Sequence, residues 1–424
     1  MNTLALTRKK SLYESIVLNI LAKMEMGTLH ISLPTGEQFT FGNGDSSITA
    51  NINIKRKAFF KRCILYGDIG FGETYVDGDW DTDNITNVIK WFLLNVEHSP
   101  GISGTKTKSF AVNVLRFFNK LSQLKKINNI SGSKKNISEH YDLNNDFFKI
   151  FLDPAMTYSC AYFKDTEMNL TQAQHEKYDR LCKKLNLKPT DHVLEIGSGW
   201  GGNAIHIAKN YGCKVTTVTI SEEQYSYAKD RIEKENLSDK IEVRIQDYRN
   251  IEGQFDKIVS IEMLEAVGYK FLDVYFKKCH ELLKKNGILA LQVITCPDSR
   301  YESLRKGVDW IQKYIFPGSL LPSVAAINKS INNTGDMTLV DLKEMGLHYA
   351  KTLTLWREGF NKNLSEVRKL SLKKEFSDVV ELGFDEKFIR KWNYYLGYCE
   401  AAFTMRNINV MQLIYSRPNN LNLN

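Results

Sequence analysis

The stretch VLEIGSGWGG, at residues 193–202, constrains the fold of this chain more than any other. An apolar run reaches an acid, Glu195, and is followed by glycines at alternate positions, namely Gly197, Gly199 and Gly201. Glycines let the backbone pass close to a ligand, and a helix that follows presents unpaired N–H groups at its start. The segment therefore predicts a buried strand, a tight turn and a helix, with a ligand held at the turn.

Strand-like and helix-like segments alternate on both sides of this turn. The alternation predicts an α/β fold with a doubly wound sheet. A further strand-like run near the C-terminus, MQLIYSRP, is expected to close the sheet, and residues 297–335 are interpreted as an insertion. The other strand-like runs lie at 192–198, 214–221, 240–247, 257–263 and 287–295.

Three regions separate along the 424 residues. Residues 1–95 combine a helix-like start, two alternating runs around Pro34-Thr35-Gly36 that are typical of a hairpin, and a glycine-interrupted helix, which predicts a small α+β N-terminal domain. Residues 96–135 are interpreted as a linker with a short basic helix, whose lysines suit phosphate headgroups but more commonly form a solvated face. Residues 136–424 are expected to form the catalytic domain, with a cap insertion at about 297–335.

Composition narrows the class of protein. Hydrophobic residues make up 43% and charged residues 25% of the chain, as in a soluble globular protein. The sequence predicts no transmembrane helix, no signal peptide and, from seven scattered cysteines, neither a disulfide framework nor a metal site. A cytoplasmic protein is expected. The net charge of +8 favours anionic surfaces, and without a nucleic-acid-binding motif we expect no nucleic acid partner.

The acid before the glycines distinguishes this loop from a dinucleotide-binding turn. GxGxxG would have its acid about 20 residues after the glycines. The spacing E-x-G-x-G-x-G is instead the pattern of class I S-adenosylmethionine (SAM) methyltransferases, and a tight turn without a ligand explains it less well. Glu195, Gly197, Gly199 and Gly201 are therefore candidate SAM-binding residues. Glu222 and Glu223 are interpreted as first-turn charges favoured by the helix dipole rather than as ribose ligands.

Five segments together resemble one family, the cyclopropane-fatty-acyl-phospholipid synthases, which are related to the mycolic acid cyclopropane synthases. The resemblance covers nearly the whole chain, and residues 58–80 are similar to the N-terminal domain of the phospholipid-acting branch. It implies a class I SAM-methyltransferase fold with a seven-stranded sheet and a helical cap. The segments are HYDLNNDFFKIFLDPAMTYSCAYF (140–163), the glycine loop, IVSIEMLEAVG (258–268), WIQKYIFPGSLLPS (310–323) and HYAKTLTLWREGF (348–360).

The resemblance also implies a reaction on unsaturated membrane phospholipids. The cis double bond of an acyl chain attacks the SAM methyl group, and a base, which is bound bicarbonate in the family, removes a proton as a cyclopropane closes. An alkene is a poor nucleophile, so the methyl donor must be held in line, and the carbocation needs aromatic faces, negative charge and exclusion of water. The protein is expected to contact the inner face of the membrane peripherally and, like many relatives, to form a homodimer.

Site residues follow from the family's motif positions. The resemblance implies SAM contacts at Tyr158, Ser159, Thr219, Ile220, Gln224, Gln246 and Asp247, besides the glycine loop. It implies bicarbonate contacts at Cys160, Glu265, Gln292, Ile294 and Tyr349, with Cys160 acting through its backbone or its thiol and Ile294 through its amide.

Two positions depart from the family pattern. Ala266 and Gln292 stand where the family commonly has histidine, and a glutamine can donate a hydrogen bond but cannot exchange a proton near neutral pH. The departure leaves open whether the product is a cyclopropane or a methylene- or methyl-branched chain. Of the two glutamates in IEMLE, we expect Glu265 to be functional and interpret Glu262 as a surface carboxylate.

Two other functions compete with this one. Plant alkaloid N-methyltransferases share a version of the 140–163 segment, but the N-terminal domain and WIQKYIFPG disfavour a small-molecule amine substrate. A non-catalytic SAM- or lipid-binding protein is disfavoured by the intact glycine loop together with Cys160, Glu265 and Tyr349.

Overall fold

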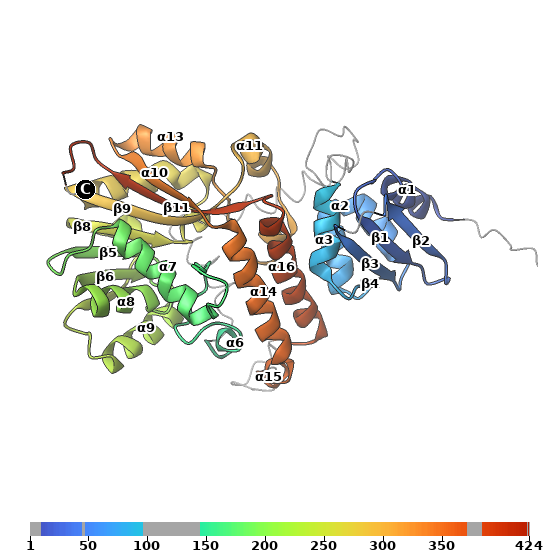
Figure 1. Cartoon of the computed structure of the whole chain (residues 1–424), viewed down its shortest axis with the longest axis horizontal. Coiled ribbons are helices and arrows are strands. Elements are labelled where there is room, and N and C mark those ends of the chain that lie inside the picture. The colour runs from blue at the N-terminus through green and yellow to red at the C-terminus, as the bar shows by residue number, and fades with distance from the viewer. Residues whose placement is uncertain (1–9, 45–46, 96–144, 371–383, 422, 424) are drawn as a thin grey trace, which may run out of the picture. The chain divides into compact units, whose positions relative to one another are not determined.

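The computed structural model describes residues 10–44, 47–95, 145–370, 384–421 and 423 (Figure 1). The chain divides into two compact units, one comprising Met1–Lys120 and Phe384–Met405 and the other Leu121–Gly383 and Arg406–Asn424. The basic helix predicted in the 96–135 linker lies outside the described residues. Within them, no helix has the length and apolarity needed to cross a membrane, and no group of metal-binding side chains forms a cluster.

The first unit contains a four-stranded sheet in the order β2-β1-β3-β4. β1 and β2 form the predicted antiparallel hairpin, and β3 pairs parallel to β1. Gly67, with φ 58°, interrupts the second helix, as the glycines there predict. The elements are α1 (Leu12–Leu21), β1 (Thr28–Ser32), β2 (Gln38–Gly42), β3 (Thr49–Ile54), α2 (Ala58–Val76), β4 (Trp80–Asp81) and α3 (Ile85–Leu94).

A helix from the far end of the chain completes this unit. α16 (Glu386–Thr404) lies in the stretch expected to be purely catalytic, yet it groups with the N-terminal elements. Its Arg390 donates to the Asp81 carboxylate at 2.6 Å, and its Glu400 accepts from the Thr86 hydroxyl at 2.9 Å. These contacts, between residues about 300 apart in sequence, join α16 to the N-terminal elements.

The second unit is built on a seven-stranded sheet in the order β10-β11-β9-β8-β5-β6-β7. β5 to β9 run parallel, and β11 runs antiparallel to both of its neighbours, which confirms the predicted doubly wound sheet. β11 does not close the sheet as expected, because it lies between β9 and the edge strand β10. The strands are β5 (His192–Ile196), β6 (Lys214–Thr219), β7 (Ile241–Ile245), β8 (Phe255–Ile261), β9 (Leu283–Thr295), β10 (Thr338–Glu344) and β11 (Asn409–Ser416).

Helices cover both faces of this sheet. α10 and α13 pack on one face, and α7, α8 and α9 on the other (Figure 1). α13 lies within the predicted cap insertion, but its Ile327 and Ile331 belong to the core over the sheet. The helices are α6 (Asn145–Lys149), α7 (Leu170–Lys184), α8 (Gly202–Tyr211), α9 (Glu222–Lys234), α10 (Leu272–Leu282), α11 (Asp298–Lys306), α12 (Trp310–Tyr314), α13 (Val324–Thr334), α14 (Gly346–Lys362) and α15 (Leu364–Leu370).

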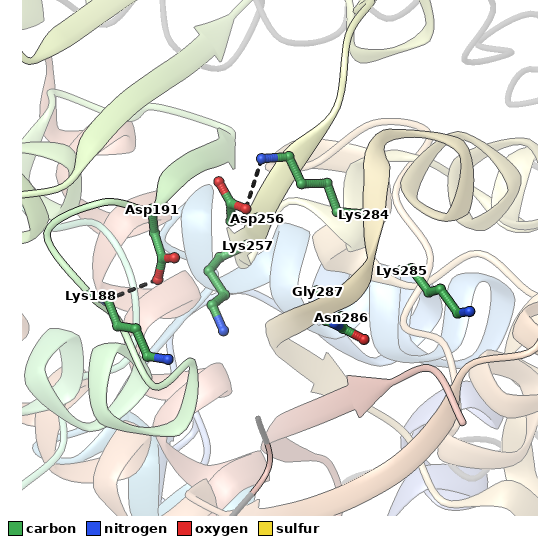
Figure 2. A pocket seen from close by; sticks show the side chains of 8 residues that line it. All are labelled: Lys188, Asp191, Asp256, Lys257, Lys284, Lys285, Asn286 and Gly287. Atoms are coloured by element: carbon green, nitrogen blue, oxygen red, sulfur yellow. Dashed lines mark hydrogen bonds and ion pairs between the residues drawn. The ribbon is translucent and has the colours of Figure 1, made fainter. Parts of the chain in front are cut away.

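The two edges of the parallel strands differ in chemistry. At the amino ends of β5, β8 and β9 a surface hollow is lined by lysines and aspartates, with Lys284 paired to Asp256 at 2.8 Å (Figure 2). The glycine loop and the other predicted site residues instead follow the carboxyl ends. Ligands of doubly wound folds bind at the carboxyl edge, which is where these candidate site residues lie.

Candidate active site

The glycine loop leaves β5 in a conformation that favours glycine. Gly197 has φ +98°, and a Cβ added to it would lie 3.2 Å from Met263 Cγ. The N–H groups of Gly197 and Ser198 both donate to the Val218 carbonyl at 3.0 Å, which fixes the turn. A Cβ added at Gly199 would meet no described atom within 4 Å. The loop is therefore held to β6 at Gly197 and Ser198 and is open beside Gly199, where a ligand can approach the backbone.

Glu195 braces this loop from beneath. Its carboxylate accepts hydrogen bonds from the Thr217 hydroxyl at 2.6 Å and from the Asn203 amide at 2.8 Å. Burial raises the pKa of Glu195 to about 7. The hydrogen bonds join β5, β6 and the first turn of α8, so the predicted SAM-binding acid positions the loop through contacts inside the protein.

The end of β6 is fixed by local polar contacts. The Thr219 hydroxyl donates to Gln224 Oε1 at 2.9 Å, and Ser221 caps α9 by accepting from the Gln224 N–H. Glu222 and Glu223 lie in the first turn of α9, as the interpretation from the helix dipole predicts. Thr219, Ile220 and Gln224 thus lie together at the carboxyl edge of the sheet.

The loop after β7 joins the same edge. The Gln246 N–H donates to the Thr219 carbonyl at 2.9 Å, and its side chain donates to Asn250 O at 2.7 Å. The Asp247 carboxylate accepts from Arg249 Nε at 2.8 Å and from Nη2 at 2.6 Å. Asp247 is therefore already paired with a cation, which leaves the backbone of this loop as its part best placed to meet a ligand.

Aromatic side chains form a wall beside the glycine loop. Tyr158 stacks on Trp356 of α14 with ring centroids 5.2 Å apart, and it meets the edge of Phe148 at 5.2 Å. Phe148 lies 5.0 Å from Trp200 of the loop, and Tyr349 lies 6.0 Å from Trp356. Aromatic faces attract cations, so this wall suits a sulfonium or a carbocation. We refer to these five residues as the aromatic wall.

A buried lysine supports the segment that follows Tyr158. Lys177 of α7 is fully buried and donates to Ser159 Oγ at 2.7 Å. Burial lowers its pKa to about 8, while the charges of Glu262, Cys160, Asp153 and Glu195 oppose that shift. Sequence reasoning missed Lys177. The available signal was its spacing of four from the buried Ala173 and Leu181, which places a lysine on the apolar face of the helix.

Cys160 contributes to the site through its backbone. Its N–H donates to Glu262 Oε1 at 2.8 Å, and its carbonyl accepts from Gln292 Nε2 at 3.1 Å. The thiol donates instead to the carbonyls of Ala161 at 3.2 Å and Met345 at 3.7 Å. Burial and the charge of Glu262 raise the pKa of the thiol well above its ordinary value, so it stays protonated.

We expect replacement of Cys160 by alanine to reduce kcat by less than about tenfold, because the two backbone hydrogen bonds survive and only a small buried side chain is lost. Steady-state methyl transfer, with the melting temperature as a control of folding, measures this effect. A loss of about a thousandfold in a folded variant, the size expected for an acid–base group, would contradict the backbone role.

Glu262 occupies the centre of the site, and its interpretation as a surface carboxylate is wrong. It follows β8 with φ +50°, a conformation uncommon outside glycine. Its Oε1 accepts from Cys160 N–H and from Gln292 Nε2, each at 2.8 Å, and its carboxylate also hydrogen-bonds the Tyr349 side chain. The left-handed turn and these donors hold the carboxylate inside, a fact that motif position alone did not indicate.

Glu265 lies next to Glu262 but in a different environment. It accepts from the Ile294 N–H at 2.5 Å, while its buried Oε2 meets no hydrogen-bond partner among the described residues. Burial and the charge of Glu262 raise the pKa of Glu265 to about 8. Burial raises the pKa of both neighbouring carboxyl groups, so the two titrate as a coupled pair.

Gln292 is locked in place by contacts on both ends of its amide. The NH₂ group donates to Cys160 O and Glu262 Oε1, and the amide oxygen accepts from Gln412 of β11 at 3.0 Å. Gln292 thus links its own strand, β9, both to β11 and to the segment that carries Cys160. The structure brings together the five residues predicted to contact bicarbonate. Glu262, which was not one of the five, lies beside them.

The chain was compared with known proteins. Residues 129–413 match the family model of mycolic acid cyclopropane synthetase. The chain is 39% identical to the cyclopropane-fatty-acyl-phospholipid synthase of Escherichia coli K12, over 88% of this chain and 89% of that protein. It is 36% identical to the tuberculostearic acid methyltransferase UfaA1 of Mycobacterium tuberculosis, over 84% of this chain and 80% of that protein.

Solved structures support the fold assignment. The cyclopropane synthase MmaA2 of Mycobacterium tuberculosis matches with a TM-score of 0.60 and 28% identity, covering 67% of this chain and 98% of that one. Coclaurine N-methyltransferase matches with a TM-score of 0.61 over 82% of this chain and 98% of its own, but at 22% identity, which shows the fold alone. The predicted fold class and family are confirmed: the chain belongs to the mycolic acid cyclopropane synthetase family of SAM-dependent methyltransferases.

Proposed function

We propose that the protein transfers the methyl carbon of SAM to the cis double bond of an unsaturated acyl chain in a membrane phospholipid, and that a cyclopropane is formed. The observation that carries this proposal is a carboxylate, Glu262, held by Cys160, Gln292 and Tyr349 at the edge where the glycine loop and the aromatic wall lie. Such an arrangement suits the removal of a proton beside a transient cation. The names of the Escherichia coli synthase and of UfaA1 support an acyl substrate.

The residues of the glycine loop fit SAM. The open side of Gly199 allows close approach of the ligand, and Thr219, Gln224 and the loop of Asp247 border the same edge. SAM supplies an electrophilic methyl group when bound. The aromatic wall then stabilises positive charge, and its four buried rings, Phe148, Trp200, Tyr349 and Trp356, exclude water, which would otherwise capture a carbocation.

Bicarbonate, in contrast, does not fit the donors that the resemblance assigns to it. The N–H of Cys160 and the amide of Gln292 already donate to Glu262, and the N–H of Ile294 donates to Glu265. No step of the proposed mechanism therefore passes through bicarbonate.

The membrane is part of the proposal. An acyl double bond lies within the bilayer, so the enzyme must bind the surface and draw the middle of the chain into its site. The net charge of +8 supports peripheral contact with the anionic inner face, and the N-terminal domain is proposed to assist in it. The homodimer expected from the resemblance stays a prediction.

The test uses purified full-length protein, SAM carrying a ¹³C-labelled methyl group, and vesicles of a dioleoyl phospholipid mixed with a soluble amine. We expect labelled acyl chains that have gained one carbon, and upfield cyclopropane methylene protons in the NMR spectrum. Methylene protons in the alkene region would instead identify a methylene-branched product. The substrate class, an unsaturated acyl chain, would stay the same. Label on the amine alone would overturn the proposal.

A further inference from the structure

The polar groups expected to surround a bound bicarbonate are directed at the protein's own carboxylates. Cys160 N–H and Gln292 Nε2 each lie 2.8 Å from Glu262 Oε1, and the Tyr349 side chain hydrogen-bonds the same carboxylate. A glutamate carboxylate and bicarbonate share a planar, negatively charged O–C–O group that accepts the same donors. Glu262 therefore already satisfies the donors of the expected anion site.

The second carboxyl group leaves still less room for another anion. Glu265 takes the Ile294 N–H at 2.5 Å. The negative charge of Glu262 already helps to raise the pKa of Glu265. Bicarbonate beside these two carboxyl groups would have to be desolvated while the N–H and amide donors assigned to it are already taken, which is unfavourable.

The surroundings of Glu262 also suit a proton acceptor. Gln292 cannot turn away, because Cys160 O and Gln412 fix both ends of its amide. Burial raises the pKa of Glu262, which suits a group that takes up a proton, while the donors around it and the charge of Lys177 oppose that shift. The left-handed backbone at Glu262 is the kind of conformation that is retained where function requires it.

We propose that Glu262 is the proton acceptor of the reaction and that the protein works without bound bicarbonate. This inference rests on the proposed function. The alkene electron pair forms a C–C bond to the methyl carbon as its C–S bond breaks, leaving S-adenosylhomocysteine and an acyl carbocation. The Glu262 carboxylate takes a proton from the new methyl group, and the electrons of that C–H bond close the ring. A neutral product and a protonated Glu262 result.

The first test measures whether turnover depends on bicarbonate and whether the protein binds it. Wild-type turnover on dioleoyl vesicles is compared in bicarbonate-depleted buffer and after bicarbonate is restored, and binding is followed by line broadening of ¹³C-bicarbonate. We expect turnover to change by less than about twofold, with no broadening in the presence of S-adenosylhomocysteine. Loss of turnover when bicarbonate is depleted would overturn the inference. Saturable broadening of the ¹³C-bicarbonate signal in the presence of S-adenosylhomocysteine would overturn it as well.

The second test removes the carboxylate. Glu262→Gln is expected to lower kcat by about a thousandfold, within the usual range for an acid–base group, while S-adenosylhomocysteine binds as in wild type. Glu262→Ala is expected to regain activity with added bicarbonate or formate and to broaden ¹³C-bicarbonate. Glu252→Gln, the same change on an exposed loop, is the control with unchanged kcat. A folded Glu262→Gln with wild-type kcat would overturn the role of Glu262.

The two proposals fail in different ways. Wild-type protein that never labels acyl chains contradicts the proposed function, whereas the ¹³C-bicarbonate measurement still decides whether this site takes the anion. If neither Glu262 variant folds, the depletion and binding measurements on wild-type protein decide the inference alone.

Discussion

Replacement of Gly197 by alanine is expected to weaken SAM binding by about 100-fold, which corresponds to about 2.7 kcal/mol. The backbone there has φ +98°, and the new Cβ would lie 3.2 Å from Met263 Cγ and 3.3 Å from Met263 Cβ. The loop cannot relax without losing the paired hydrogen bonds from Gly197 and Ser198 to Val218 O. Left-handed strain of about 1–2 kcal/mol and overpacking of about 1–3 kcal/mol together account for the expected loss.

Gly253 provides a matched control for this substitution. It has φ +97°, close to that of Gly197, but an added Cβ would meet no described atom within 4 Å. Gly253→Ala should therefore show the strain as a lower melting temperature while binding SAM as in wild type. Calorimetric titration with S-adenosylhomocysteine, together with thermal unfolding of both variants, separates the two effects. Equal affinities for the two variants would show that the space beside Gly197 does not control the cofactor site.

Much of the fold followed from the sequence because central strands such as β5 and β9 contain runs of buried, mostly apolar residues. β10 did not, since its residues alternate between partly buried and exposed, and only its pairing with β11 (Leu339 with Tyr415, for example) identifies it as a strand. The position of α16 was also beyond local patterns. It depends on hydrogen bonds such as that of Glu400 to Thr86, which no short segment of sequence contains.

The site shows a similar division. Motif positions predicted that Cys160, Gln292 and Tyr349 lie near one another. In the structure these three residues surround one carboxylate. The motif positions did not indicate whose carboxylate it is, because that depends on the left-handed backbone of Glu262. Nor did they show that the thiol of Cys160 turns away from Glu262 to the carbonyls of Ala161 and Met345. Hydrogen-bond direction is a three-dimensional property that a motif does not encode.

Replacement of Lys177 by methionine is expected to lower kcat by about 100-fold at pH 7, within the range for a group that supports acid–base catalysis. The cation of Lys177 lowers the pKa of Glu262, so its removal raises that pKa and leaves the proposed base protonated more of the time. The variant should therefore recover activity as the pH rises. The pKa of Lys177 itself is about 8, so the wild-type cation is also lost above that pH, and the two proteins should converge there.

The pH profile distinguishes this electrostatic role from simple packing. The other groups that act on Glu262, namely Gln292, Cys160, Tyr349 and Glu265, are unchanged in the variant, so a shift in the acid limb of kcat reports the lost cation. Lys183→Met, at the exposed end of the same helix, controls for the change of residue type because Lys183 forms a surface ion pair with Asp179. A loss of kcat that is equal at every pH would mean that Lys177 serves only to hold Ser159 in place.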